Sequence, residues 1–180
     1  RYLAGPYGTY QLALLGADVV KIESRDGDET RSQLISKEWA DRKMPPGFLA
    51  VNGNKRSITL DLRRPEAVEI VKRLAVKADV VWENFRPGVM DKLGLGYETL
   101  SAINSRLIYC AVSGFGHTGP ERTTAAFDGK LQAMSGIMSI TGEPAGGPMR
   151  LSAETAQQLA ARAAAASRGQ QTSAADPAAA

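Results

Sequence analysis

Short apolar runs and amphipathic segments alternate along the chain, and this pattern predicts alternating strands and helices. The clearest helix begins at Pro65, a residue suited to a first helical turn. Its apolar residues Val68, Val71, Leu74 and Ala75 form a stripe on one face. In chain order the pattern predicts a helix over 9–15, strands over 19–23 and 57–62, the helix from 65, a strand over 80–82, a short helix from 89, a helix near 98–103, a strand over 107–112 and a helix over 127–139.

Strands that alternate with helices through short connections are typical of an α/β fold. We therefore predict a Rossmann-like, doubly wound parallel sheet within residues 1–150. Two stretches are expected to be irregular: residues 4–8, which read as a turn, and the Pro-Pro-Gly at 45–47, which is expected to exclude regular structure. From Leu151 onward the chain is rich in Ala and offers almost no apolar face, so residues 151–180 are expected to form a disordered, low-complexity tail.

The segment at 78–97 joins a predicted buried strand to a helix through a polar turn. The strand is followed by Glu-Asn-Phe-Arg at 83–86, and Pro87-Gly88 then turns the chain. In a parallel α/β sheet, ligands bind at the carboxyl ends of the strands. Asn84 and Arg86 are therefore candidate ligand contacts. The alternative is an ordinary turn with solvated side chains.

Composition and charge narrow the function classes. Of the 180 residues, 43% are hydrophobic and 23% are charged, as in soluble globular proteins. No apolar run approaches the roughly 20 residues needed to span a bilayer. The net charge of +3 comes without a block of consecutive Lys or Arg, which argues against nucleic acid but suits a small polyanionic ligand. A single Cys, Cys110, beside a single His, His117, favours a cytosolic setting and argues against a zinc site from this chain alone.

The Gly-rich loop at 114–119, Gly-Phe-Gly-His-Thr-Gly, matches the fingerprint of dinucleotide-binding proteins and follows a predicted strand. That fingerprint needs a helix to open at its third Gly, so that backbone amides meet the pyrophosphate. Here Pro120 follows at once, and no second strand ending in an acid is evident downstream. An NAD-dependent oxidoreductase is therefore a less favoured alternative. His117 has no Ser or Cys nucleophile in a recognisable elbow beside it, and we expect a surface loop residue.

Eight motifs stand in order along residues 1–150. They are Leu-Ala-Gly-Pro-Tyr at 3–7, Leu-Gly-Ala-Asp-Val-Val-Lys-Ile-Glu at 15–23, Asn-Lys-Arg-Ser-Ile at 54–58, Leu-Asp-Leu at 60–62, Ala-Asp-Val-Val-Trp-Glu-Asn-Phe-Arg-Pro-Gly at 78–88, Leu-Gly-Leu-Gly-Tyr at 93–97, Ser-Gly-Phe-Gly-His-Thr-Gly-Pro at 113–120 and Gln-Ala-Met-Ser-Gly at 132–136. Together they resemble the N-terminal part of the family III CoA-transferases, the group that includes formyl-CoA and carnitine CoA-transferases and the α-methylacyl-CoA racemases.

The resemblance implies a Rossmann-like large domain, an interlocked homodimer of the full-length form, and transfer of CoA between an acyl-CoA and a free carboxylic acid. In that family an Asp carboxylate attacks the thioester and splits one difficult exchange into simpler covalent steps. We expect CoA, as the acyl-CoA substrate, and no metal. By motif position it implies these CoA contacts: Ala4, Leu60, Arg63, Asn84, Phe85 and Arg86, with Lys92 in place of an Arg and with Arg25 substituting for an Arg expected at Ser24.

The chain departs from the family pattern at the catalytic Asp. That residue is expected a short distance beyond Arg150, where this sequence has Gln157 in the Ala-rich tail. We hypothesise that residues 151–180 are a misframed or truncated end, and that the chain has no catalytic residue and is inactive alone. It would then be a non-catalytic CoA-binding fragment. The racemase branch uses a His immediately before an Asp; here that pair is Phe127-Asp128, and Phe cannot shuttle a proton. Transferase is therefore favoured over racemase.

Overall fold

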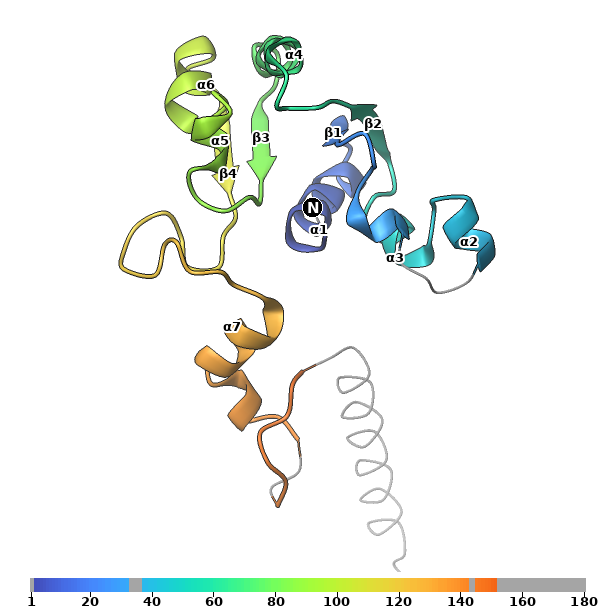
Figure 1. Ribbon diagram of the computed structural model, residues 1–180, viewed down its shortest axis with the longest axis vertical. Coiled ribbons are helices and arrows are strands. Elements are labelled where there is room, and N and C mark those ends of the chain that lie inside the picture. Colours follow the sequence, from blue (N-terminus) through green and yellow to red (C-terminus); the bar gives the residue numbers. More distant parts are fainter. Residues whose placement is uncertain (1, 33–36, 143–144, 152–180) are drawn as a thin grey trace, which may run out of the picture. The chain divides into compact units, whose positions relative to one another are not determined.

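The computed structural model describes residues 2–32, 37–142 and 145–151. The chain divides into two compact units, Arg1–Thr124 and Ala125–Ala180. The first contains α1 (Ala4–Leu14), β1 (Val19–Glu23), η1 (Glu29–Ser32), α2 (Lys37–Asp41), α3 (Pro46–Leu49), β2 (Lys55–Thr59), α4 (Pro65–Ala75), β3 (Val80–Glu83), α5 (Val89–Lys92), α6 (Tyr97–Ile103) and β4 (Ile108–Ala111), and the second contains α7 (Asp128–Met134) and η2 (Ile137–Ser139) (Figure 1).

The strands form two parallel pairs. β1 pairs with β2, with Val19 opposite Lys55, and β3 pairs with β4, with Val80 opposite Ile108. Parallel pairing requires a crossover connection. α2 and α3 lie between β1 and β2 in the chain, and α5 and α6 lie between β3 and β4. The mixed α/β character with parallel strands is thus confirmed. Within the described residues the pairs are two separate two-stranded sheets, so the doubly wound single sheet stays a prediction.

The core of the first unit lies between the helices and the β3–β4 pair. Val71 and Ala75 of α4 are buried with Met90, Leu95, Leu100 and Leu107. The predicted stripe on α4 was wrong at Leu74, which is 39% exposed, because the buried face follows Ala67, Val71 and Ala75 at four-residue spacing. The side-chain amide of Asn104 donates to the carbonyl oxygens of Ala75 at 3.0 Å and Ala78 at 2.9 Å, and so fixes the end of α4.

Three local predictions were wrong, and Pro explains the first two. Residues 4–8 form the first turns of α1, because Pro6 fits an early helical position and the amide of Tyr7 already bonds to the Leu3 oxygen at 2.7 Å. The Pro-Pro-Gly at 45–47 does not exclude a helix, since Pro46 opens α3. The helix predicted over 127–139 ends at Met134, because Gly136 takes a left-handed φ of 78° before η2 begins.

In the second unit, a side chain of α7 holds the last described residue. Gln132 of α7 donates to the carbonyl oxygen of Leu151 at 2.8 Å and accepts from the amide of Leu151 at 2.7 Å. Apart from Leu151, the tail predicted over 151–180 lies outside the described residues, and its disorder stays a prediction. Among the described residues, every helix is too short or too polar to cross a membrane.

The buried core identifies the positions at which a substitution should destabilise the first unit. Leu100 is fully buried, so Leu100→Ala should lower the free energy of unfolding by about 2–5 kcal/mol through lost burial and the cavity left behind. Leu15 is 85% exposed, and Leu15→Ala should change that free energy by less than about 0.5 kcal/mol. Urea unfolding followed by circular dichroism measures both. Equal effects of the two variants would contradict the assigned core.

Candidate functional site

Polar residues follow the carboxyl ends of the parallel strands. In each strand pair, one further backbone hydrogen bond follows the last paired residues. The amide of Leu60 donates to the backbone oxygen of Glu23 at 2.8 Å, and the amide of Val112 donates to that of Glu83 at 2.9 Å. The segments after β1 and β2 are therefore neighbours, and so are those after β3 and β4. This is the edge at which parallel α/β sheets bind ligands.

Helix α1 packs on β3 through two glycines. A Cβ atom at Gly5 would lie 2.8 Å from the Asn84 side-chain oxygen, and one at Gly8 would overlap the Trp82 ring. Side chains at these positions would force the helix away from the strand. The close packing places the first turn of α1, which contains Ala4, beside Asn84. Two of the predicted CoA contacts are thereby brought to one place.

The turn after β3 is anchored from inside the unit. Glu83 is 7% exposed and its carboxylate accepts from the amide of Phe85 at 2.7 Å. Phe85 packs against the buried core, whereas Arg86 is exposed. Gly88 then takes a left-handed φ of 83°, which L side chains rarely adopt. Lys92, at the end of α5, is also exposed.

The predicted contacts on the first strand pair lie on neighbouring loops. Leu60 is partly buried against the core, and Arg25 and Arg63 are exposed. Arg63 donates to the Asp61 carboxylate at 2.8 and 3.0 Å. These bonds, together with the charge of Asp26 in the loop after β1, raise the pKa of Arg63. Its guanidinium is thus held at the strand end and is open to solvent.

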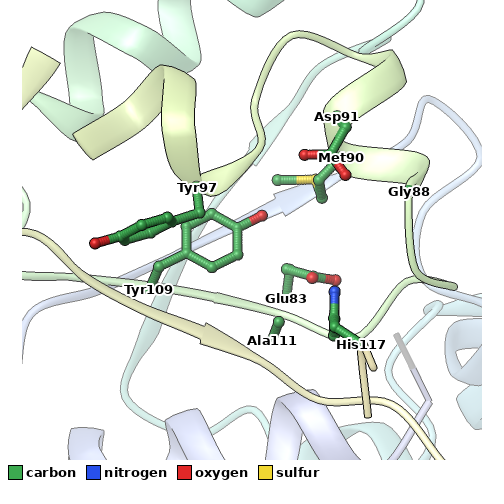
Figure 2. A pocket seen from close by; sticks show the side chains of 8 residues that line it. All are labelled: Glu83, Gly88, Met90, Asp91, Tyr97, Tyr109, Ala111 and His117. Carbon is green, nitrogen blue, oxygen red and sulfur yellow. The ribbon is translucent and has the colours of Figure 1, made fainter. Parts of the chain in front are cut away.

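A cavity of about 260 Å³ opens at the carboxyl ends of β3 and β4, and it was not predicted. Figure 2 shows its wall, in which the ring of His117 and the carboxyl group of Glu83 are directed toward one another. The rings of Tyr97 and Tyr109 meet edge to face with centroids 6.1 Å apart. The lining residues are Glu83, Gly88, Met90, Asp91, Tyr97, Tyr109, Ala111 and His117.

The cavity is acidic in character. Burial raises the pKa of Glu83, and Asp91 adds to this, while the Phe85 amide and the charge of His117 act in the opposite direction. Burial and the charges of Glu83 and Asp91 also raise the pKa of Tyr109. Two acidic groups around a small cavity disfavour an anionic ligand. The exposed cations therefore suit an anionic ligand better than this cavity does.

A second buried acid supports the end of β1. Arg31 donates to both carboxylate oxygens of Glu23 at 2.7 Å, and the Ser57 hydroxyl adds a third bond at 2.7 Å. Burial alone would raise the pKa of Glu23, but these bonds outweigh it and lower the pKa to about 2. Asp28 is held in the same way by Lys21 at 2.7 Å, and its pKa also falls to about 2.

Two other expectations concern residues outside the strand-end turns. Cys110, expected in the core, is only partly buried, and burial raises the pKa of its thiol. Asp128 begins α7 and accepts from Gln132 at 2.8 Å and Arg150 at 3.3 Å. The position near Gln157, where the catalytic Asp is expected, lies outside the described residues. In the described part of the chain, His, Cys, Asp and Glu side chains form no group able to hold a metal ion.

Comparison with known proteins gives one consistent family. The model of CoA-transferase family III matches residues 1–169. The succinate–glutarate CoA-transferase of Agrobacterium fabrum is 46% identical over 154 residues, which cover 83% of this chain and 38% of that protein. The acetyl-CoA:oxalate CoA-transferase of Acetobacter aceti is 46% identical over 158 residues, covering 87% of this chain and 40% of that protein. The chain thus spans well under half the length of these relatives.

A solved structure extends the comparison to the fold. The crystal structure of a CAIB/BAIF family protein from Brucella suis superposes with a TM-score of 0.76 at 42% sequence identity. The match covers 96% of this chain and 48% of that protein.

The buried acids of β1 predict how stability depends on pH. Because the folded pKa of Glu23, about 2, lies below its ordinary value of 4.5, the charged form stabilises the folded chain above pH 4.5. That contribution is lost as the pH falls toward 2. Urea unfolding across this range should show a steep loss of stability that Glu23→Gln makes shallower. Glu69→Gln, at an exposed position on α4, should keep the steep profile. A wild-type profile flat across this range would contradict the assignment.

Proposed function

The chain belongs to CoA-transferase family III, and on that premise we propose that it binds the CoA part of an acyl-CoA at the carboxyl ends of its strands. The whole protein would move CoA between a thioester and a free carboxylic acid. The observation that carries this proposal is the packing of the first turn of α1 against Asn84, with Arg86 exposed two residues further on. One short surface thus offers the backbone amide of Ala4, the side-chain amide of Asn84 and the cation of Arg86.

These groups match the chemistry of CoA, which carries phosphates at one end and amide groups along its pantetheine arm. Arg25, Arg63, Arg86 and Lys92 are exposed cations suited to the phosphates. Asn84 can both donate to and accept from a pantetheine amide. Leu3 provides no side-chain cap to α1, and the exposed residue Ala4 can offer its amide to a ligand oxygen. Leu60 and Phe85 would support these contacts from the core side.

For the whole protein we propose the aspartyl route. A carboxylate attacks the thioester carbonyl, the C–S bond breaks, and an acyl anhydride forms as CoA leaves as the thiolate. The thiolate then attacks the enzyme's side of the anhydride, which gives an enzyme–CoA thioester and releases the first acid. The acceptor carboxylate completes the exchange in reverse order. The described residues of this chain are proposed to bind CoA for that sequence, and the chain alone to lack transfer activity.

The relatives support the substrate class and not its individual members. Those compared act, by name, on succinate and glutarate or on acetyl-CoA and oxalate, all of which are small carboxylic acids or their thioesters. Racemisation is not proposed, because Phe127 occupies the position of the proton-transferring His and is 72% exposed. An interlocked homodimer and a cytoplasmic location are proposed from the family resemblance and the single Cys.

Calorimetric titration of the chain with CoA tests the proposal. We expect binding that weakens as salt rises, because phosphates and exposed cations attract one another in solvent. Arg86→Ala should raise the Kd for CoA by about tenfold through loss of one charge-assisted contact. Arg106 is also an exposed Arg and precedes the amino end of β4, so Arg106→Ala should leave the Kd unchanged.

Two results would contradict the proposal. Equal Kd values for Arg86→Ala and Arg106→Ala would exclude the carboxyl ends as the binding edge. Binding of NAD in preference to CoA would instead favour the dinucleotide site suggested by the Gly-rich loop at 114–119. Formation of a new acyl-CoA from the acceptor acid, with release of the first acid, would show turnover, against the expected inactivity of the chain alone.

A further inference from the structure

Lys55, the first residue of β2, occupies a cage of carbonyl oxygens. Its ammonium donates to the backbone oxygens of Pro6 and Val51, each at 2.7 Å, and to the side-chain oxygen of Asn52 at 3.1 Å. A protonated Lys has three donors, and all three have an acceptor here. The ammonium is therefore saturated by the protein, so Lys55 is unsuited to hold a phosphate itself.

The surroundings of Lys55 disfavour its protonated form. Burial and the nearby charge of Lys21 lower the pKa of Lys55 to about 8, while Asp28 opposes the shift. Burial of this cation therefore contributes little to stability by itself. The geometry of its hydrogen bonds indicates the role of Lys55.

Lys55 ties two distant segments together. Pro6 lies in the first turn of α1 and is 49 residues away in the sequence, whereas Val51 and Asn52 immediately precede β2. The hydroxyl of Thr9 reinforces the same turn by donating to the oxygens of Gly5 at 3.0 Å and Pro6 at 3.1 Å. We call this set, Lys55 and Thr9 on the carbonyls of Gly5 and Pro6, the α1 clamp.

The clamped turn has little space to move. Gly5 lies so close to Asn84 that a single added carbon atom would meet the side-chain oxygen at 2.8 Å. A small displacement of this turn therefore changes the spacing between Ala4 and Asn84. Binding groups need to be held within fractions of an ångström to act together.

We propose that Lys55 is a positioning residue for CoA binding, which acts by holding the first turn of α1 against β3 through the Pro6 carbonyl. This inference rests on the proposed function and deepens it. Lys55 does not touch CoA. Thr9 supports the same turn from within α1.

The test compares Lys55→Met with a variant that loses similar bonds elsewhere. Asn104 also donates to two backbone carbonyls, those of Ala75 and Ala78, and it precedes the amino end of β4. Lys55→Met should raise the Kd for CoA by about tenfold, as expected for loss of one well-placed hydrogen bond or more. Asn104→Ala should lower the melting temperature and leave the Kd unchanged at a temperature where both variants are folded.

Thr9→Val provides a milder second variant. It removes the hydroxyl of the α1 clamp and keeps Lys55, so it should raise the Kd for CoA by a smaller factor than Lys55→Met. If Lys55→Met does not fold, Thr9→Val alone tests whether the clamp positions the CoA site. An unchanged Kd in folded Lys55→Met, or in Thr9→Val when the first variant is unfolded, would overturn the inference. So would an equal rise in Asn104→Ala. A wild-type chain that does not bind CoA would overturn the proposed function, and this inference with it.

Discussion

The packing of α1 on β3 is the constraint on which the candidate site depends. Gly5 and Gly8 leave out the side chains that would separate the helix from Asn84 and Trp82. This contact joins the start of the chain to the carboxyl end of a strand that begins at Val80. The parallel pairing of β3 with β4 then fixes the edge at which both the turn after β3 and the Gly-rich loop emerge.

At the carboxyl ends of the strands, acidic side chains are buried and the predicted binding cations are exposed. The buried acids Glu23 and Glu83 hold the ends of β1 and β3 through bonds to Arg31, Ser57 and the Phe85 amide. The predicted binding cations lie outside, exposed to solvent. In the function proposed above, CoA meets the exposed cations at the surface, and the cavity lined by Glu83 and Asp91 is not part of its site. None of the residues that line the cavity is one of the predicted CoA contacts.

Local sequence patterns predicted the strands better than they predicted the site. The alternation of Val20 and Ile22 with polar neighbours identified β1, and the apolar run from Val80 identified β3. The start of α1 was missed, because Gly-Pro-Tyr-Gly has the composition of a turn and only packing against β3 explains its glycines. Tertiary context overrides local propensity at such a position.

The supporting contacts could not be read from the sequence for a different reason. Ser57 and Glu23 are 34 residues apart, and Lys55 and Pro6 are 49 apart, so no periodicity within an element relates them. Family resemblance named candidate CoA contacts but not these partners. The acidic cavity had one sequence signal, namely the acid of Glu83 at the end of an apolar strand run, where a buried carboxylate requires a partner.

Amide hydrogen exchange with and without CoA tests the central claim most directly, because it reports on each segment of the unmodified chain. We predict that CoA slows exchange in peptides covering residues 3–8 and 84–88, at the first turn of α1 and the turn after β3. Peptides covering 104–107, at the amino end of β4, should exchange at the same rate in both states. Slowing confined to 104–107, or none in 3–8 and 84–88 under saturating CoA, would contradict a CoA site at the carboxyl ends of the strands.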